Sequence, residues 1–277
     1  MIEGFQADLH CHTTCSDGTF SPKEVIMAAK AANLQGLSIT DHDTITAYET
    51  AFSYAEEFGI RLLPGVEFST IHKGQSIHVL AYAFSSSHRG IQEFCKEHHE
   101  RRRVRMFQMI DLLGKQGIKL SADEVFEDAN SIGRPHLAKV LIRKGIVKNL
   151  KEAFQEYLGD GKSCFVPSNT VSTEETIAII REANAFAVIA HPHLIKQQEI
   201  VLDLLKLDFD GLEGYYARFQ PHQERVWIKI AQERGWMITG GSDFHGSIKP
   251  QIPLGCSWVG ESTFKVLYDR YQENLNG

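Results

Sequence analysis

The chain lacks any apolar run long enough to cross a bilayer, which takes about 20 residues, so we expect neither a membrane-spanning segment nor a membrane partner. It also lacks an excess of basic residues, because 29 lysines and arginines stand against 35 acidic residues, for a net charge of −6. Non-specific binding to long duplex nucleic acid requires a broad basic surface, so this charge argues against such a partner. A small phosphorylated substrate is not excluded, because bound metal ions would add positive charge.

Cysteine is also scarce. The five cysteines are odd in number and lack the spacing of a zinc finger or a disulfide framework, so we expect the reducing environment of the cytoplasm. The first residues, Met1–Gln6, have neither the basic start nor the apolar segment of a signal peptide. Of the 277 residues, 43% are hydrophobic and 23% are charged, which is ordinary for a globular protein with one barrel-sized domain or two smaller ones.

The stretch Ala7–Gly18 combines two histidines with an aspartate. His10 and His12 end a short apolar run at positions i and i+2, so on a strand their side chains point to one face. Asp17 follows in the next loop, and residues 21–24 have the sequence of a helix capping box. Two imidazoles and a carboxylate in this order suit a divalent metal ion. Two half-buried histidines at a strand end would give the same pattern.

Further strand-like runs carry residue types that bind metals. The runs 36–40, 61–66, 186–190 and 237–241 are each followed by a histidine or a carboxylate, and the run 76–83 contains a histidine. Because the site of a β/α barrel gathers residues from the ends of several strands, we predict that these side chains converge. The residues supplied in this way are His42, Glu67, His78, His191, Asp243 and His245.

The chain resembles the polymerase and histidinol phosphatase (PHP) family in a series of motifs that occur in order along nearly its whole length. These are D-L-H-C-H with S-D-G, then T-D-H-D, G-V-E, I-H-V, A-H-P and G-S-D-F-H. A G-R-P-H segment at 133–136 resembles the branch of the family that acts on nucleotide bisphosphates and on the 5′ ends of short RNA. The resemblance implies an α/β fold, a distorted (β/α)7-type barrel, with an all-helical insertion.

The resemblance also implies three divalent metal ions. The first would be held by His10, His12, Glu67 and Asp243, the second by Glu67, His78 and His191, and the third by Asp17, His42 and His245. Histidine mixed with carboxylate and without thiolate favours manganese, iron or zinc over copper or calcium, and we expect manganese. Asp41 and Asp43 flank His42 and are expected to support the ligands rather than to bind metal.

The strand pattern stops between about Gly90 and Pro167, where helices are predicted over 92–114, 122–129, 135–144 and 150–158. We therefore predict a metal-binding barrel made of residues 1–89 and 168–277, with a helical insertion or cap over 90–167. The basic run Arg101–Arg105 opens this insertion. It is either a solvated helix face or an electrostatic entry for a polyanion.

Three residues are candidates for contact with substrate phosphate. Arg134 and Arg218 could clamp phosphoryl oxygens, because a guanidinium group matches their geometry, and a structural role is the alternative for each. Arg134 precedes Pro135 and is expected just outside a helix start. His136 could contact the substrate or protonate the leaving oxygen. The candidate catalytic residues are Asp243, His191 and His136, and the role of His193 stays open.

We therefore predict a metal-dependent hydrolase that cleaves phosphate esters by a metal-activated hydroxide. Its expected substrates are 3′,5′-nucleotide bisphosphates, the 5′ ends of short RNA, or both. One alternative is a phosphatase for a non-nucleotide metabolite similar to histidinol phosphate. Another is a metal-stabilised accessory domain without turnover. The sequence does not determine the base preference or the oligomeric state.

Overall fold

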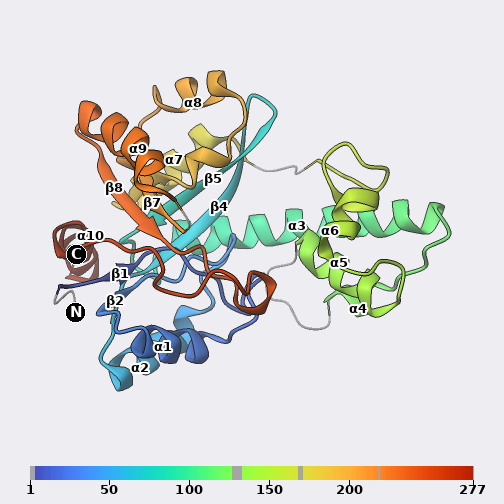
Figure 1. Ribbon diagram of the computed structural model, residues 1–277, viewed down its shortest axis with the longest axis horizontal. Coiled ribbons are helices and arrows are strands. Elements are labelled where there is room, and N and C mark those ends of the chain that lie inside the picture. The colour runs from blue at the N-terminus through green and yellow to red at the C-terminus, as the bar shows by residue number, and fades with distance from the viewer. Residues whose placement is uncertain (1–3, 127–132, 168–170, 218, 277) are drawn as a thin grey trace.

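Two sheets form the centre of the computed structural model, which describes residues 4–126, 133–167, 171–217 and 219–276 (Figure 1). The first sheet is parallel, with strand order β1-β2-β3. In the second, β5 runs antiparallel to both β4 and β6, and β6, β7 and β8 are parallel. The strands are β1 (Ala7–Asp8), β2 (Gly36–Leu37), β3 (Arg61–Leu62), β4 (Gly65–His72), β5 (Gln75–Tyr82), β6 (Phe186–Ile189), β7 (Gly211–Tyr216) and β8 (Met237–Gly241).

The predicted α/β fold is confirmed, but strand pairing does not close a barrel within the described residues. The sheets are joined at their edges by single bridges, for example between Cys11 and Phe244 and between His42 and Glu67. The predicted strand 36–40 is regular only over its first two residues. Beyond them the chain still pairs with the segment after β1, because the amide of Thr40 donates to the carbonyl of Cys11. The ends of β1 and β2 thus approach β8 and β4 as irregular segments.

Most helices cover the outer faces of the sheets (Figure 1). Helix α1 begins with the predicted capping box, in which the Ser21 hydroxyl accepts from the Glu24 amide and the Glu24 carboxylate accepts from the Ser21 amide. The C-terminal helix α10 was not predicted; its Phe264 is fully buried. No described helix is long and apolar enough to cross a bilayer. The helices that cover the sheets are α1 (Pro22–Ala31), α2 (Tyr48–Phe58), α7 (Thr173–Glu182), α8 (Gln198–Leu204), α9 (Pro221–Arg234) and α10 (Glu261–Asn276).

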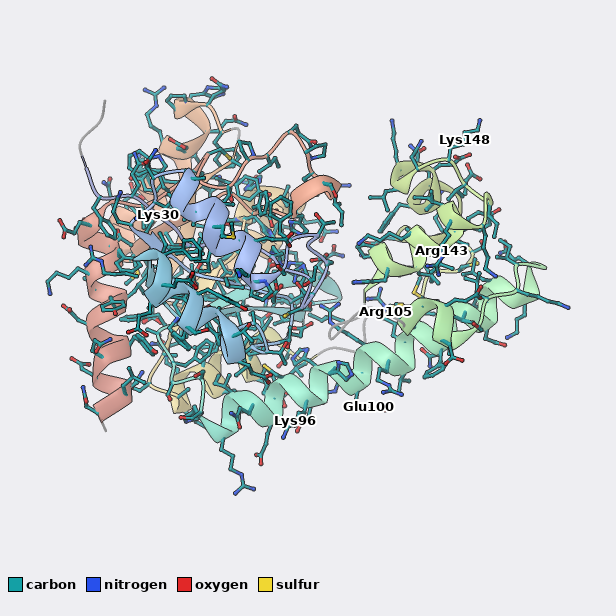
Figure 2. The ribbon with its side chains drawn as sticks, turned by 90° about the horizontal axis from the view of Figure 1, so that it is seen from below. Lys30, Lys96, Glu100, Arg105, Arg143 and Lys148 are labelled. Carbon is teal, nitrogen blue, oxygen red and sulfur yellow. The ribbon has the colours of Figure 1, made fainter. Side chains whose placement is uncertain are left out.

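The elements described between β5 and α7 are all helical. Helix α3 (Arg89–Lys115) runs away from the sheets, and its distal half packs with α4 (Ala122–Phe126), α5 (Arg134–Arg143), α6 (Leu150–Ala153) and a π-helical turn at 154–158. We call this group, with the distal half of α3, the helical arm (Figures 1 and 2). The arm has a separate apolar core. Its fully buried members include Met109, Leu113, Leu137, Leu141 and Leu158.

Helix α3 also belongs to the core under the second sheet. Near its start, Ile91 and Phe94 pack with Val66 and Phe68 of β4. One continuous helix therefore contributes to both apolar cores. This shared helix fixes where the arm leaves the sheets.

The expectation that Arg134 lies just outside a helix start is wrong, because Arg134 is the first residue of α5. Gly133 takes the extended N-cap conformation, with φ −135° and ψ 174°. Arg134 and Pro135 then occupy the first two helical positions, where an amide needs no partner within the helix. The Gly133 amide donates to Nδ1 of His136, which closes the cap.

The separate core of the arm leads to a prediction about local stability. Leu137→Ala should leave a cavity there and cost about 2–5 kcal/mol of local stability. Hydrogen exchange followed by mass spectrometry should show faster exchange in α5 and in distal α3, while β4 and β5 stay protected. The matched control is Leu80→Ala, which removes a fully buried side chain from the core of the sheets. Equal acceleration in the sheets and the arm of Leu137→Ala would show that the two cores unfold together.

Candidate metal centre

The histidines and carboxylates predicted to bind metal meet at one end of the two sheets. His10 and His12 follow β1, and His42 follows β2. Glu67 lies within β4 and pairs with His42 through a parallel bridge. His78 comes from β5, and the loops after β6 and β8 supply His191, Asp243 and His245. His191 and Asp243 have positive φ angles, +27° and +52°, so the backbone turns sharply where each ligand is presented.

Glu67 lies at the centre of this cluster and is 1% exposed. Its Oε2 is 3.2 Å from Nε2 of His10 and from Nε2 of His12, and 3.1 Å from Nδ1 of His42. Its Oε1 is 2.8 Å from both Nδ1 of His78 and Nε2 of His191. Burial alone would raise the pKa of the Glu67 carboxyl, but the charges of the imidazoles hold it well below its usual range. Glu67 is therefore a carboxylate shared between two groups of histidines.

Two further carboxylates complete the cluster. Asp17 Oδ1 lies 3.4 Å from Nε2 of His245 and 3.7 Å from Nδ1 of His12, and Asp17 Oδ2 lies 3.9 Å from Nε2 of His42. Asp243 Oδ1 is 3.3 Å from Nε2 of His12. Burial would raise the pKa of each carboxyl, but the neighbouring imidazole charges hold both well below their usual range. Both groups are therefore ionised at neutral pH.

The residues present fit divalent cations. Buried ring nitrogens of His10 and His12 and one oxygen each of Asp17 and Glu67 have no hydrogen-bond partner in the described structure. Leaving such groups buried and unpaired is costly, and a cation coordinated by them would remove that cost. Three overlapping groups bring their ligand atoms within 4.8 Å of one another: His10, His12 and Glu67; His42, Glu67 and His78; and His12, Asp17, His42 and His245. Oxygen and nitrogen donors without sulfur suit manganese, iron or zinc.

Asp41 and Asp43 support the cluster from behind. Asp41 accepts hydrogen bonds from the amide and hydroxyl of Thr13 and from the hydroxyl of Ser16, and so braces the loop that carries Asp17. Asp43 accepts from the Ser69 amide at 2.7 Å and pairs with Arg102 of α3. The second contact ties the His42 loop to the shared helix.

Sequence reasoning missed three residues that contact the ligands. The Glu213 carboxylate, fully buried in β7, lies 2.9 Å from Nδ1 of His10 and accepts from the amide of His191. Tyr216 and Lys249 both donate to Oδ2 of Asp243, at 2.6 and 2.7 Å. A single glutamate inside an apolar run was a signal for Glu213, whereas the contacts of Lys249 depend on the folding of a loop.

A cleft of about 460 Å³ lies between the cluster and the helical arm. His42, His78 and Asp17 line one side, and the three guanidinium groups of Arg102, Arg105 and Arg134 line the other. Burial and, to a smaller extent, the charges of Arg134 and Arg102 together lower the pKa of Arg105 to about 10. Arg102 pairs with Asp43 and Arg134 with Asp160, so two of the three guanidinium groups have a carboxylate partner.

The three residues predicted to contact substrate phosphate do not lie together in the cleft. Arg134 binds Asp160 at 2.6 Å and lies over the rings of Phe154 and Phe165, so it forms a salt bridge and also lines the cleft. His136 lines a separate hollow on the far side of the Asp17 loop. Arg218 lies outside the described residues.

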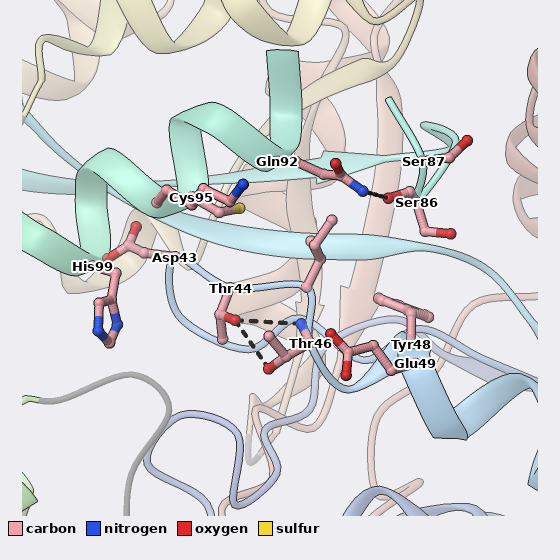
Figure 3. A pocket seen from close by; sticks show the side chains of 12 residues that line it. Asp43, Thr44, Thr46, Tyr48, Glu49, Ser86, Ser87, Gln92, Cys95 and His99 are labelled. Atoms are coloured by element: carbon pink, nitrogen blue, oxygen red, sulfur yellow. Dashed lines mark hydrogen bonds between the residues drawn. The ribbon is translucent and has the colours of Figure 1, made fainter. Parts of the chain in front are cut away.

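Two features near the cluster contain none of the nine predicted metal ligands. The ring of His193 packs against those of Tyr216 and Phe219, each at 4.3 Å between centroids, beside the predicted ligand His191. A hollow of about 620 Å³ lies between the loop 43–46, the start of α2 and α3 (Figure 3). Its lining includes Asp43, but none of the nine predicted ligands.

An α/β fold that gathers imidazoles and carboxylates beside an arginine-lined cleft defines the class of metal-dependent phosphoesterases. The chain belongs to the PHP domain family, whose sequence profile matches residues 8–167. It is 33% identical over 258 residues to the 5′-3′ exoribonuclease of Haemophilus influenzae, with 91% of each chain covered. It is 31% identical over 246 residues to the 3′,5′-nucleoside bisphosphate phosphatase of Chromobacterium violaceum, with 86% of each covered. The solved structure of an inferred metal-dependent phosphoesterase from Bifidobacterium adolescentis matches with a TM-score of 0.85 at 30% identity, over 95% of this chain and 96% of that one. The predicted family resemblance is confirmed.

Glu213 provides a test of how the cluster is oriented. A carboxylate that accepts from Nδ1 of His10 leaves Nε2 available as a metal ligand, and loss of such a partner lowers metal affinity by about 10- to 100-fold. Glu213→Gln should therefore bind manganese that much more weakly in competition with a chelator. Glu182→Gln, which changes an exposed carboxylate of α7, should bind as the unmodified protein does. Unchanged affinity in Glu213→Gln would show that this carboxylate does not orient His10.

The overlapping ligand groups predict more than one ion per chain. Elemental analysis of protein equilibrated with manganese should find well over one equivalent, because one catalytic ion uses only three or four protein ligands. His42→Ala, which removes a member of two groups, should lower the count by about one. His222→Ala removes an exposed histidine of α9 and should leave it unchanged. A count of one ion in all three proteins would reduce the cluster to a single site.

Proposed function

We propose that the chain hydrolyses 3′,5′-nucleotide bisphosphates and removes nucleotides from the 5′ end of short RNA. The observation that supports this most directly is the cleft in which Arg102, Arg105 and Arg134 face the carboxylate and imidazole cluster. Two separate anion-binding features suit a substrate with two phosphates, one at the cluster and one at the arginines. The names of the relatives from Haemophilus and Chromobacterium agree with such a substrate.

In this proposal the nine predicted ligands hold three divalent ions, with manganese as the expected metal. Ions held there would act as Lewis acids and lower the pKa of bound water. Glu67 is placed to be shared between sites, because its two oxygens face different histidines. Tyr216 and Lys249 hold Oδ2 of Asp243, which leaves Oδ1 toward the cluster. Asp243 and His191 would be catalytic through contact with the reacting phosphate and its ions.

The arginines would bind the phosphate that is not cleaved. Arg134 is held by Asp160 and by two aromatic rings, so its guanidinium is ordered before a substrate arrives. Arg105 donates through Nε to the carbonyl of Val166, which leaves its terminal nitrogens toward the cleft. In this proposal the 5′-phosphate of a nucleotide would lie at the arginines and its 3′-phosphate at the cluster.

We also propose the domain organisation that the sequence suggests. Residues 1–89 and 168–277 would form the metal-binding unit as a distorted barrel, and 90–167 would form a cap. The separate core of the arm supports this division. Because α3 contributes to both cores, the cap would be rooted firmly in the metal-binding unit.

Arg134 provides the test of the proposed substrate. Arg134→Met should lower kcat/KM for a 3′,5′-bisphosphate by about 30- to 1000-fold, equivalent to about 2–4 kcal/mol for a preorganised charged contact. Hydrolysis of an aryl phosphate, which has no second phosphate, should fall much less. The measurement is phosphate release with manganese present. Asp160→Asn is the matched control, because it removes the negative charge that pairs with Arg134 but keeps the guanidinium.

Three results would contradict this assignment. Equal losses on both substrates would place Arg134 at the reacting phosphate. A lower melting temperature without a kinetic change would leave the salt bridge to Asp160 as its role. Hydrolysis of the aryl phosphate but not of the bisphosphate by the unmodified protein would contradict the nucleotide substrate itself.

A further inference from the structure

A second hollow, of about 350 Å³, lies between α5 and the loop that follows His12. One wall of this hollow, here called the α5 groove, is basic and the other is small and polar. The basic wall is formed by His136, Lys139 and Arg143, and the opposite wall by Thr14, Gly18 and Thr19.

The basic side chains are spaced to follow a chain of phosphates. Residues 136, 139 and 143 are three and four positions apart, so they share one face of α5. Lys139 and Arg143 are separated by roughly 6 Å along the helix axis, which is comparable with one step between phosphates of an extended single strand. The guanidinium of Arg143 donates to the carbonyl of Glu124 at 3.1 Å, and this contact holds it at the groove.

The one acidic side chain of the groove is offset by a cation. The Glu124 carboxylate lies 2.7 Å from Nζ of Lys144. This contact and the Ser121 amide lower the pKa of Glu124 to about 2, so it remains ionised and paired. The groove therefore keeps a net positive wall.

The groove and the arginine cleft are walled by the same loop. Thr14, Gly18 and Thr19 line the groove, while Ser16 and Asp17 of the same loop line the arginine cleft. His136 lines the groove. Burial lowers its pKa, the charge of Asp17 raises it and the charge of Lys139 lowers it further, so both charges act on the imidazole. The arginine cleft and the groove thus lie on either side of the loop that carries Asp17, one of the predicted metal ligands.

We propose that the α5 groove binds the phosphodiester backbone of an oligonucleotide on the 3′ side of the bond that is cleaved. This rests on the proposed function. The 5′-phosphate would lie at the arginines, the scissile phosphate at the cluster, and the following phosphates beside Lys139 and Arg143. A 3′,5′-bisphosphate ends at the cluster and does not reach the groove. The groove would therefore favour short RNA over mononucleotides.

The first test measures binding without turnover. A 5′-phosphorylated RNA of five nucleotides with a 3′ fluorescent label is titrated with protein in EDTA, and fluorescence anisotropy is recorded at several salt concentrations. The slope of log affinity against log salt should be shallower by about 1.4 for Lys139→Ala/Arg143→Ala, because each phosphate contact to a single strand contributes about 0.7. Affinity at 0.1 M salt should fall by about 25-fold.

Matched variants separate the groove from general charge and from misfolding. Lys148→Ala/Lys151→Ala removes two exposed lysines that line neither the groove nor the cleft, and should bind as the unmodified protein does. Figure 2 labels Lys148. Lys139→Ala alone keeps the contact between Arg143 and Glu124. Its slope should be shallower by about 0.7.

The second test compares substrates with manganese present. Lys139→Ala/Arg143→Ala should lose kcat/KM on the five-nucleotide RNA by about the factor seen in binding, and by no more than about twofold on a 3′,5′-bisphosphate. An unchanged salt slope, or equal losses on both substrates, would contradict the proposal that the α5 groove binds the RNA backbone. If the unmodified protein hydrolyses neither substrate, the proposed function fails. The binding experiment would still decide whether the α5 groove binds RNA.

Discussion

The burial of the Glu67 carboxylate among imidazoles is the constraint on which the structure of the site depends. A buried anion is stable only when charges or donors surround it, so the strand ends that carry those groups must converge on it. The register of β4 is equally constrained, because a shift of one residue would turn Glu67 to the other face of the sheet. The bridge between His42 and Glu67 joins the two sheets at this point. Fold and metal centre are therefore specified by the same contacts.

Local patterns in the sequence were sufficient to predict that the histidines and carboxylates meet, and to predict several helix starts. His10 and His12 stand two residues apart, which places both on one face of an extended chain, and Ser21 with Glu24 forms a cap that needs only four residues. Glu213 and Lys249 could not be assigned in this way, because their contacts require β7 and a distant loop to be folded against the cluster. The start of α5 was misplaced because the Gly133 cap involves the side chain of His136.

The two sheets and the helical arm carry different chemistry. The sheets present acidic and imidazole groups at or just beyond the ends of strands. The arm presents cations, among them Arg105 and Arg134, on helices that have a separate core. Changes in the apolar core of the arm can therefore move the cations without disturbing the metal ligands. Substrate choice can vary while the hydrolytic centre stays the same.

Because α3 is long, a small rotation at its root produces a large displacement at its far end. Its 27 residues extend about 40 Å, with Phe94 anchored under β4 and Leu113 in the core of the arm. A tilt of about 5° at the root would displace the far end by about 3.5 Å, which is more than the length of a hydrogen bond. The salt bridge between Asp43 and Arg102 lies near the middle of the helix, next to the His42 loop. A small adjustment of packing around Phe94 is thus amplified into a change in the width of the gap that the substrate enters.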